Sequence, residues 1–216
     1  AGVRGMRLAW SPDFGYAGVD PEVLQVTEKA ARLFEELGAT VETPNLVLED
    51  PFPAFWDVFA TATYTSYGHL LEEHRNDFSY YGRRAIEHGA EVTGADLSRA
   101  IFRVDQLGRQ LEDFFDDYDL LLSPTMGVTA YLVDGYPMVM DENESYANPG
   151  WNYRALTHPI NTVGYPAASV PCGFSEKGLP IGLHIVGRKG AETTVLAASA
   201  VFEAARPWAE RRPPVS

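Results

Sequence analysis

The sequence predicts an α/β fold with a mixed, mostly parallel sheet flanked by helices. Two observations predict it. Short apolar segments alternate with longer segments whose apolar residues recur at helical spacing, as strands and helices alternate in α/β proteins. In the last third, the apolar segments 167–171 and 181–186 are joined by residues 172–180, where Lys177 and Gly178 predict a tight turn and therefore an antiparallel pair of strands.

The N-terminal part predicts a strand–helix–strand unit. Residues 6–10 are apolar apart from Arg7 and predict the first strand. Asp20 followed by Pro21 predicts the start of a helix, because an acidic side chain caps the free N–H groups and proline suits the first helical position. Gly38 ends that helix, and residues 40–46 predict a second strand. We expect the two strands to pair in parallel with a right-handed crossover.

Residues 52–71 predict a helix that is rich in aromatic side chains. Phe52, Phe55, Trp56 and Phe59 recur at i, i+3, i+4 and i+7, which places them on one helix face. An aromatic face of this kind is usually part of the core. The alternative is a hydrophobic wall beside a substrate, and Phe55 is the candidate for that role.

Two further helices are predicted, at residues 96–118 and 193–205. The apolar residues expected to face inward are Leu97, Ile101, Val104, Leu107, Leu111, Phe114 and Phe115 in the first helix and Val195, Leu196, Val201 and Phe202 in the second.

Charge and composition exclude several classes of function. The chain has 30 acidic and 17 basic residues, a formal charge of −13, which argues against binding nucleic acid or an anionic membrane. The one cysteine, Cys172, is expected to be a small buried hydrophobe rather than a nucleophile. No apolar run approaches the roughly 18 residues of a membrane span. We expect a cytoplasmic protein with no nucleic-acid or membrane partner.

Cofactor motifs are also missing. The 5 histidines do not have metal-ligand spacing, and no P-loop, G-x-G-x-x-G or paired C-x-x-C motif occurs. We therefore expect no metal site and no organic cofactor.

The segment 119–125 predicts a short buried strand that opens into a loop. Ligands of α/β proteins bind where strands end in loops, so Thr125 and Met126 are candidate substrate-binding residues. The alternative is a purely structural Pro-Thr turn. Residues 127–150 then form a long connection, and a connection of that length is more often a lid or specificity element than idle.

No catalytic residue is predicted within the chain. Acyl transfer needs a nucleophile on a tight glycine-rich turn beside a base. No serine stands in a Gly-Gly-Ser-Ser-Gly, G-x-S-x-G or S-x-x-K pattern. The lysines are only Lys29, Lys177 and Lys189, and each is expected to be an ordinary solvated side chain.

The run 159–188 contains an ordered set of motifs: Asn161, a Gly-Tyr-Pro-Ala turn at 164–167, Gly-Leu-Pro at 178–180 and a closing Gly187-Arg188. This order resembles the C-terminal segment of the amidase signature family, which uses a Ser-cisSer-Lys triad. The Gly-Met-Arg-Leu at the start of the first strand, the Asp-Pro-Glu helix start and the Glu-Leu-Gly-Ala that ends that helix also resemble the family.

The resemblance implies a function and a domain boundary. Residues 1–216 would be the C-terminal portion of a single amidase signature domain, with the catalytic half N-terminal to it. The parent enzyme would cleave carbon–nitrogen bonds of a small-molecule amide through an acyl-enzyme, while this portion builds the fold and lines the cleft. Alone it would be inactive and, with part of its sheet uncovered, could self-associate. The alternatives are a stand-alone non-catalytic binding or scaffold protein, and an A-type component of an amidotransferase.

Arg154 bears on the last alternative. In the family, the residues just before Pro159 choose the substrate, and in the A-type component of glutamyl-tRNA amidotransferase a carboxylate there recognises the amino group of glutamine. The resemblance places Arg154 at that position, which disfavours the amidotransferase and permits a substrate carbonyl or carboxylate. The alternative for Arg154 is a surface residue that caps a helix.

Overall fold

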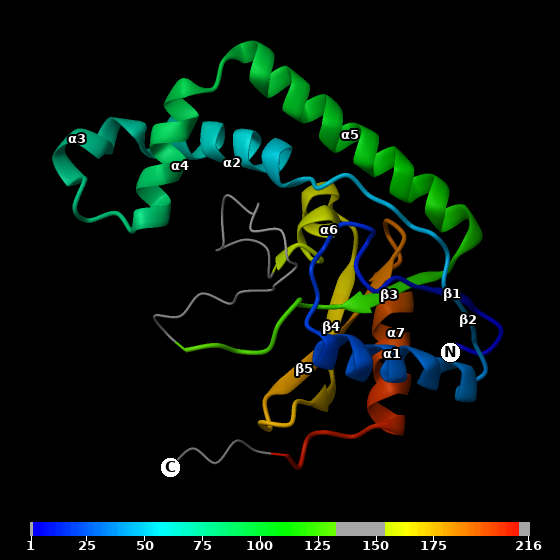
Figure 1. Ribbon diagram of the computed structural model, residues 1–216. Helices are drawn as coiled ribbons and strands as arrows, with labels where there is room; N and C mark the ends of the chain where they lie inside the picture. Colours follow the sequence, from blue (N-terminus) through cyan, green and yellow to red (C-terminus); the bar gives the residue numbers. More distant parts are fainter. Residues whose placement is uncertain (1, 133–153, 212–216) are drawn as a thin grey trace. The chain divides into compact units, whose positions relative to one another are not determined.

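The computed structural model describes residues 2–132 and 154–211, which fall into two compact units. One unit comprises Ala1–Leu48 with Leu111–Ser216, and it contains the sheet. The other, Glu49–Gln110, is helical. Both are shown in Figure 1, and each is described by itself below.

The sheet has five strands in the order β2-β1-β3-β5-β4. β1 pairs in parallel with both β2 and β3, and β5 pairs antiparallel with both β3 and β4, so the predicted mixed α/β sheet is confirmed. The strands are β1 (Arg7–Trp10), β2 (Thr40–Glu42), β3 (Leu120–Pro124), β4 (Ala167–Phe174) and β5 (Pro180–Gly187).

The second strand is shorter than predicted. The structure has three strand residues, 40–42, where the apolar pattern predicted 40–46. Pro44 gives the reason, because proline has no N–H to donate to a neighbouring strand.

One face of the sheet packs on two helices, α1 (Pro21–Glu36) and α7 (Glu192–Ala205). Asp20 caps α1 as predicted, since its carboxylate accepts a hydrogen bond from the N–H of Glu22 at 2.8 Å. The rings of Phe34 in α1 and Phe202 in α7 stack with centroids 5.6 Å apart. The core beneath the helices includes Leu8, Trp10, Leu120, Leu122, Leu183 and Ile185.

Leu196 corrects one prediction about α7. It was expected to face inward, but its side chain is 66% exposed while Val195 is buried. Successive helical residues are about 100° apart around the axis, and the position of Leu196 falls outside the face that α7 packs on the core.

The β4–β5 hairpin forms as predicted. Gly178 has a φ of +77°, a conformation that glycine adopts without strain, and its N–H bonds to the carbonyl of Ser175 at 2.8 Å. Cys172 lies in β4, half-buried against the core, and its burial raises the pKa of its thiol to about 12. The thiol is therefore protonated at neutral pH, in agreement with a packing role.

The helical unit is built on α2 (Phe52–Tyr67) and α4 (Tyr80–Glu91), with the short η1 (Gly68–Leu70) and α3 (Leu71–His74) between them. The sequence patterns above do not predict α4. The two long helices approach closely at Gly89, where a methyl group would lie 2.6 Å from the carbonyl carbon of Ala60.

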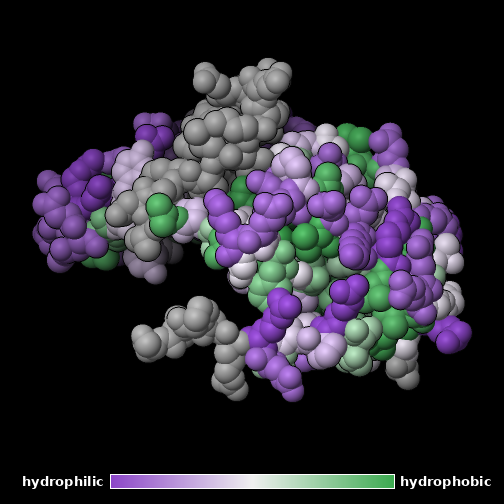
Figure 2. Space-filling model, turned by 60° about the horizontal axis from the view of Figure 1, so that its bottom comes forward, coloured by the Kyte–Doolittle hydropathy of each residue, from purple (hydrophilic) through white to green (hydrophobic). Residues whose placement is uncertain are grey.

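The helix α5 (Gly94–Asp117) begins in the helical unit, and its last residues belong to the sheet unit. Leu107, Leu111 and Phe115 are buried as predicted, but Ile101 is 54% exposed, so the predicted apolar face is not covered along its whole length. Figure 2 shows hydrophobic residues among hydrophilic ones on one face of the molecule. None of the helices in residues 2–132 and 154–211 combines the length and apolar character that crossing a membrane requires.

Candidate functional site

Polar side chains gather on part of the sheet face opposite the core. Strand side chains alternate between faces, so the core positions of β3 and β5 leave their neighbours on the other side. Ser123 of β3 lies opposite His184 of β5, and His184 lies opposite Ser169 of β4. Thr125 follows β3 on the same face as Ser123. This face thus gathers two serines, a threonine and an imidazole.

Ser123 and His184 form a buried pair. The Ser123 hydroxyl oxygen lies 3.4 Å from Nδ1 of His184 and donates to the carbonyl oxygen of Pro124 at 3.1 Å. Burial lowers the pKa of His184 to about 4, so the imidazole is neutral at neutral pH.

The Ser123–His184 pair does not meet the requirements of a nucleophile and its base. Ser123 is fully buried, so a substrate carbonyl has no access to its oxygen. The separation exceeds the roughly 2.6–3.2 Å typical of an activated pair. In the part of the chain that the structure describes, no carboxylate orients the His184 ring. We interpret the pair as a structural hydrogen bond under the site.

Thr125 has a hydroxyl partner that the sequence did not indicate. Its Oγ1 lies 2.7 Å from the Oγ of Ser169, and its backbone N–H donates to the carbonyl oxygen of Gly182 at 3.0 Å. Thr125 is half-buried and Ser169 is exposed, so the two hydroxyls are accessible from this side of the sheet. We call Thr125, Ser169 and Gly182 the hydroxyl site.

Met126 lies directly after the hydroxyl site and is partly exposed. The next residue, Gly127, accepts a hydrogen bond at its carbonyl oxygen from the N–H of Asp20, at 2.8 Å. The chain at Thr125 and Met126 is therefore anchored on both sides, to β5 and to the start of α1. The connection predicted to act as a lid, residues 127–150, lies outside the described residues from 133 onward.

Arg154 is exposed, and its carbonyl oxygen accepts hydrogen bonds from the N–H and hydroxyl of Thr157. The segment after it is held to the fold, since the Tyr16 hydroxyl donates to the carbonyl of Ala155 at 2.5 Å. His158 begins the short helix α6 (His158–Val163). Burial, with a smaller contribution from the Arg154 charge, lowers the pKa of His158 to about 4.

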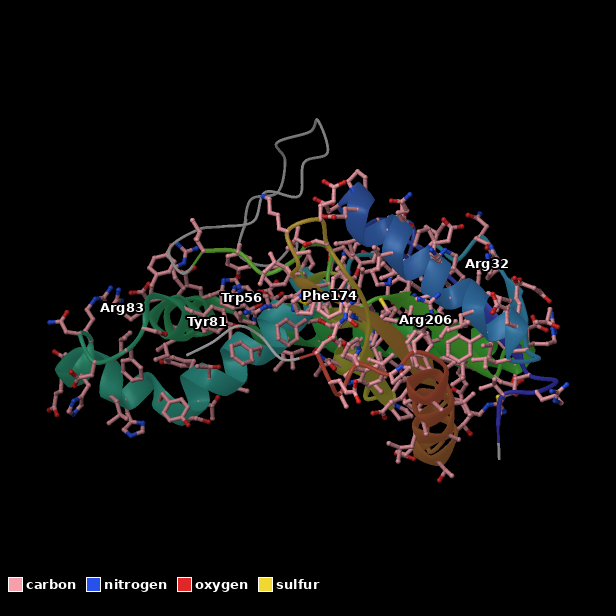
Figure 3. The ribbon with its side chains drawn as sticks, turned by 90° about the horizontal axis from the view of Figure 1, so that it is seen from below. Arg32, Trp56, Tyr81, Arg83, Phe174 and Arg206 are labelled. Atoms are coloured by element: carbon pink, nitrogen blue, oxygen red, sulfur yellow. The ribbon has the colours of Figure 1, made fainter. Side chains whose placement is uncertain are left out.

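Phe55, the fourth candidate, lies in the helical unit within an aromatic cluster. Its ring stacks on Phe59 with centroids 5.5 Å apart, and Trp56 packs on Tyr81 of α4 at 5.4 Å. Figure 3 shows Trp56 and Tyr81 side by side. The predicted core role is met only in part, because the rings are half-buried and the fully buried residues of α2 are Ala54 and Ala60. Large rings at i, i+3 and i+4 contact one another along the helix.

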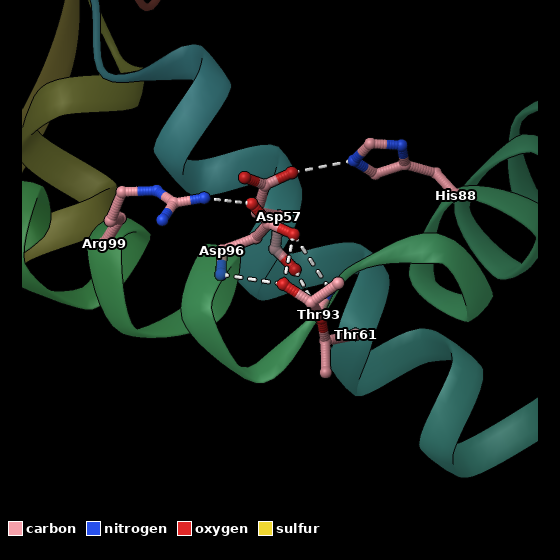
Figure 4. A network of polar contacts seen from close by, with 6 residues as sticks. All are labelled: Asp57, Thr61, His88, Thr93, Asp96 and Arg99. Carbon is pink, nitrogen blue, oxygen red and sulfur yellow. Dashed lines mark hydrogen bonds and ion pairs between the residues drawn. The ribbon is translucent and has the colours of Figure 1, made fainter.

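A polar network lies beside this cluster (Figure 4). Nε2 of His88 lies 2.7 Å from a carboxylate oxygen of Asp57, which links α4 to α2. Thr93 caps the start of α5, since its hydroxyl oxygen accepts a hydrogen bond from the N–H of Asp96 at 3.2 Å. The Asp96 carboxylate accepts in return from the N–H of Thr93 at 3.0 Å, and it also pairs with Arg99. Hydrogen bonds to Thr93 are the main reason that the pKa of Asp96 is lowered. Both sets of contacts fasten helix ends within this unit.

The three lysines do not provide a buried base. Lys29, Lys177 and Lys189 are all exposed, as predicted, and the ammonium group of Lys189 lies 5.3 Å from the centre of the Tyr165 ring. Among the described residues, no three His, Cys, Asp or Glu side chains are grouped to hold a metal ion.

The structure therefore connects one sequence-predicted candidate to two residues that were missed. Thr125 meets Ser169 and Gly182, Met126 follows Thr125 on the same anchored segment, and Arg154 lies on a different segment of the same unit. The hairpin prediction had already paired the strands of Ser169 and Gly182. Only the placement of β3 beside β5 brings Thr125 to them.

Comparisons with known proteins agree on one family. A sequence model of the Amidase family matches residues 2–196. An acylamidase of Rhodococcus erythropolis is 35% identical over 214 residues, covering 98% of this chain and 44% of that protein. The A-type component of glutamyl-tRNA(Gln) amidotransferase from Streptococcus pneumoniae (strain Hungary19A-6) is 32% identical, covering 98% of this chain and 47% of that protein.

The fold is shared with solved structures. A bacterial aryl acylamidase of the amidase signature family superimposes with a TM-score of 0.85 at 30% identity, covering 98% of this chain and 47% of that one. The chain thus spans about half the length of the relatives it matches.

Proposed function

The chain belongs to the amidase signature family, and on that premise we propose that it is part of an enzyme that hydrolyses carbon–nitrogen bonds of small-molecule acyl amides. The observation that carries the proposal is the similarity to acylamidases in both sequence and fold. The chain's −13 charge supports a small-molecule substrate rather than a nucleic acid.

In this proposal the described residues bind the substrate and shape its site, and they do not attack the amide carbonyl. An acyl-transfer enzyme needs an accessible nucleophile, a base and N–H donors for the oxyanion. Ser123 is buried and the three lysines are exposed, so none of them suits the first two roles. The proposal assigns nucleophile and base to the half of the fold that the relatives contain and this chain does not, and we expect no amidase turnover by the chain alone.

Substrate contacts are assigned to the sheet unit first. Thr125 and Met126 stand at the end of a buried strand with their backbone anchored, which suits a group that must hold a fixed position. Arg154 offers a charged donor for a substrate carbonyl or carboxylate. Phe55, in the aromatic cluster of the helical unit, remains a separate candidate for an apolar contact with a substrate.

A second candidate function is that of an A-type amidotransferase component, which the similarity to the streptococcal protein supports. A third is a scaffold that binds a partner without catalysis, with self-association through uncovered apolar surface. The positive charge of Arg154 would repel the ammonium group of glutamine, so we rank amide hydrolysis first.

The test compares two proteins: the 216-residue chain and the complete reading frame that encodes it. Each is assayed with a short aliphatic amide, an aryl amide and glutamine. We expect the complete frame to hydrolyse at least one of the two amides and the chain to hydrolyse none. Glutamine deamidation in preference to both amides would support the amidotransferase. A complete frame inactive toward all three compounds would support the scaffold.

A further inference from the structure

The hydroxyl site has a geometry that ordinary strand pairing does not produce. Thr125 follows β3 and Ser169 lies in β4, and these strands are not neighbours because β5 lies between them. Adjacent strands are about 4.8 Å apart, so the β3 and β4 backbones are separated by about 9.6 Å. The two hydroxyl oxygens are nevertheless only 2.7 Å apart. Both side chains therefore lean over β5 and meet above it.

They meet above Gly182. A methyl group built on Gly182 would lie 2.6 Å from Oγ of Ser169 and 3.0 Å from Oγ1 of Thr125. Gly182 does not have a positive φ, so its backbone would accept another residue. Glycine is needed here because the two hydroxyls occupy the space of a side chain. The site thus depends on one residue from each of three adjacent strands: Thr125 at the end of β3, Gly182 in β5 and Ser169 in β4.

The hydroxyl pair has unused hydrogen-bonding capacity. Each hydroxyl has one proton to donate and two lone pairs to accept. Among the described residues, each is the other's hydrogen-bond partner, so one proton is shared in the pair and the second proton and several lone pairs remain. Ser169 is exposed, so a ligand can reach them from solvent.

An amide matches that capacity. Its carbonyl oxygen accepts one hydrogen bond and its N–H donates one, which are the complements of a free hydroxyl proton and a free hydroxyl lone pair. The surroundings favour a neutral ligand, because the neighbour of Ser169 in β5 is His184, whose buried ring is uncharged at neutral pH. Thr125 is also held in place, by its N–H bond to Gly182 and by its β-branched side chain.

We propose that Thr125 and Ser169 together bind the amide group of a neutral substrate, and that Gly182 keeps the space between the two strands open for this hydroxyl pair. The inference rests on the proposed amide hydrolysis and adds to it two residues, Ser169 and Gly182. Thr125 contacts the ligand, Ser169 contacts it and also orients Thr125, and Gly182 is a positioning residue.

The kinetic test uses the complete reading frame and the variants Ser169→Ala, Thr125→Val and their double. Loss of a ground-state hydrogen bond should raise KM for an amide by about 3- to 10-fold with little change in kcat. The double variant should lose no more than about as much as either single variant, because the two hydroxyls act as one unit. Ser169→Thr keeps a hydroxyl and should restore KM. Ser199→Ala removes a hydroxyl that bonds within α7 and is the matched control.

A binding test separates this inference from the proposed function. Acetanilide is titrated into the 216-residue chain while the backbone amide signals of Thr125 and Ser169 are followed by NMR. We expect a saturable shift in the wild type and in Ser199→Ala, and none in Ser169→Ala or Gly182→Ala. If Gly182→Ala does not fold, Ser169→Ala alone tests whether the hydroxyl pair binds acetanilide.

The outcomes distinguish the two proposals. If the complete frame hydrolyses no amide but the chain binds acetanilide through the hydroxyl site, the function fails and this inference stands. If amides are hydrolysed and Ser169→Ala behaves like Ser199→Ala in KM and in the titration, the inference is overturned. Multiplicative losses in the double variant would overturn the claim that the hydroxyls act as a pair.

Discussion

Replacing Gly89 with alanine should separate the two long helices of the helical unit. A methyl group at Gly89 would lie 2.6 Å from the carbonyl carbon of Ala60 and 2.7 Å from Cβ of Tyr64, both on α2. Carbon atoms pack at about 3.5 Å, so relief of the contact with this carbonyl carbon alone requires the helices to move apart by about 0.9 Å, and the carbonyl oxygen of Ala60 lies nearer still. The opposing atoms are backbone or attached directly to it and cannot rotate away.

The size of the effect follows from two opposing contributions. Overpacking costs about 1–3 kcal/mol, and a clash with backbone belongs at the upper end. Alanine in place of glycine in a helix returns about 1 kcal/mol. We therefore expect Gly89→Ala to destabilise the α2–α4 pair by about 2 kcal/mol.

Hydrogen–deuterium exchange of the amides in α2 and α4 measures this locally, and about 2 kcal/mol corresponds to roughly 30-fold faster exchange through local opening. Gly82→Ala, in the same helix α4, is the control, since its nearest neighbours are at ordinary contact distance. It should leave exchange unchanged or slow it. Equal protection in Gly89→Ala and wild type would show that α2 and α4 do not pack backbone against backbone, and would refute the reasoning.

Three further predictions concern the sheet unit. Leu183→Ala removes a fully buried side chain and should lower the free energy of unfolding by about 2–5 kcal/mol, whereas Leu196→Ala, at a mostly exposed position, should change it by less than about 0.5 kcal/mol in chemical denaturation. His184 is neutral when folded down to about pH 4 but takes up a proton near pH 6.5 when unfolded, so stability present above pH 6.5 should be lost as the pH falls toward 4, by about 1.4 kcal/mol per pH unit. His158 has a similarly lowered pKa and adds its own slope, so His184→Asn should reduce the slope by the His184 contribution and leave that of His158. The exposed His69→Asn should leave the slope unchanged, and an equal slope in both variants would contradict the assignment. Arg154→Ala in the complete protein should reduce kcat/KM about 10- to 150-fold for substrates that Arg154 contacts. Full activity with an unchanged ranking of aliphatic and aryl amides would show that Arg154 is a surface residue that does not contact the substrate.

Sequence reasoning succeeded where the determining chemistry is local. The start of α1 was predicted because Asp20 and Pro21 satisfy the requirements of a helix N-terminus on their own, within a few residues. The β4–β5 hairpin was predicted because Gly178 permits the turn that joins two apolar segments. The family resemblance followed from the order of such local motifs, and the comparisons confirmed it.

Predictions from the sequence failed where the burial of a residue depends on which other element packs against it. Ile101 and Leu196 are apolar at helical spacing, yet both are exposed, because periodicity gives the width of an apolar face but not how much of it another element covers. Phe55 shows the intermediate case, since it is half-buried and its ring stacks on Phe59 of the same helix.

The hydroxyl site shows most clearly which features could be predicted from the sequence and which needed the tertiary structure. The fold class, the family, the start of α1 and Thr125 as a candidate could be predicted from the sequence, because these depend on residues close together in the chain. Ser169 and Gly182 were assigned only by the tertiary structure, since they lie 44 and 57 positions beyond Thr125. Which strand lies beside which is set by the packing of the whole sheet on its helices, and no local pattern records that two hydroxyls will meet above a glycine of the strand between them.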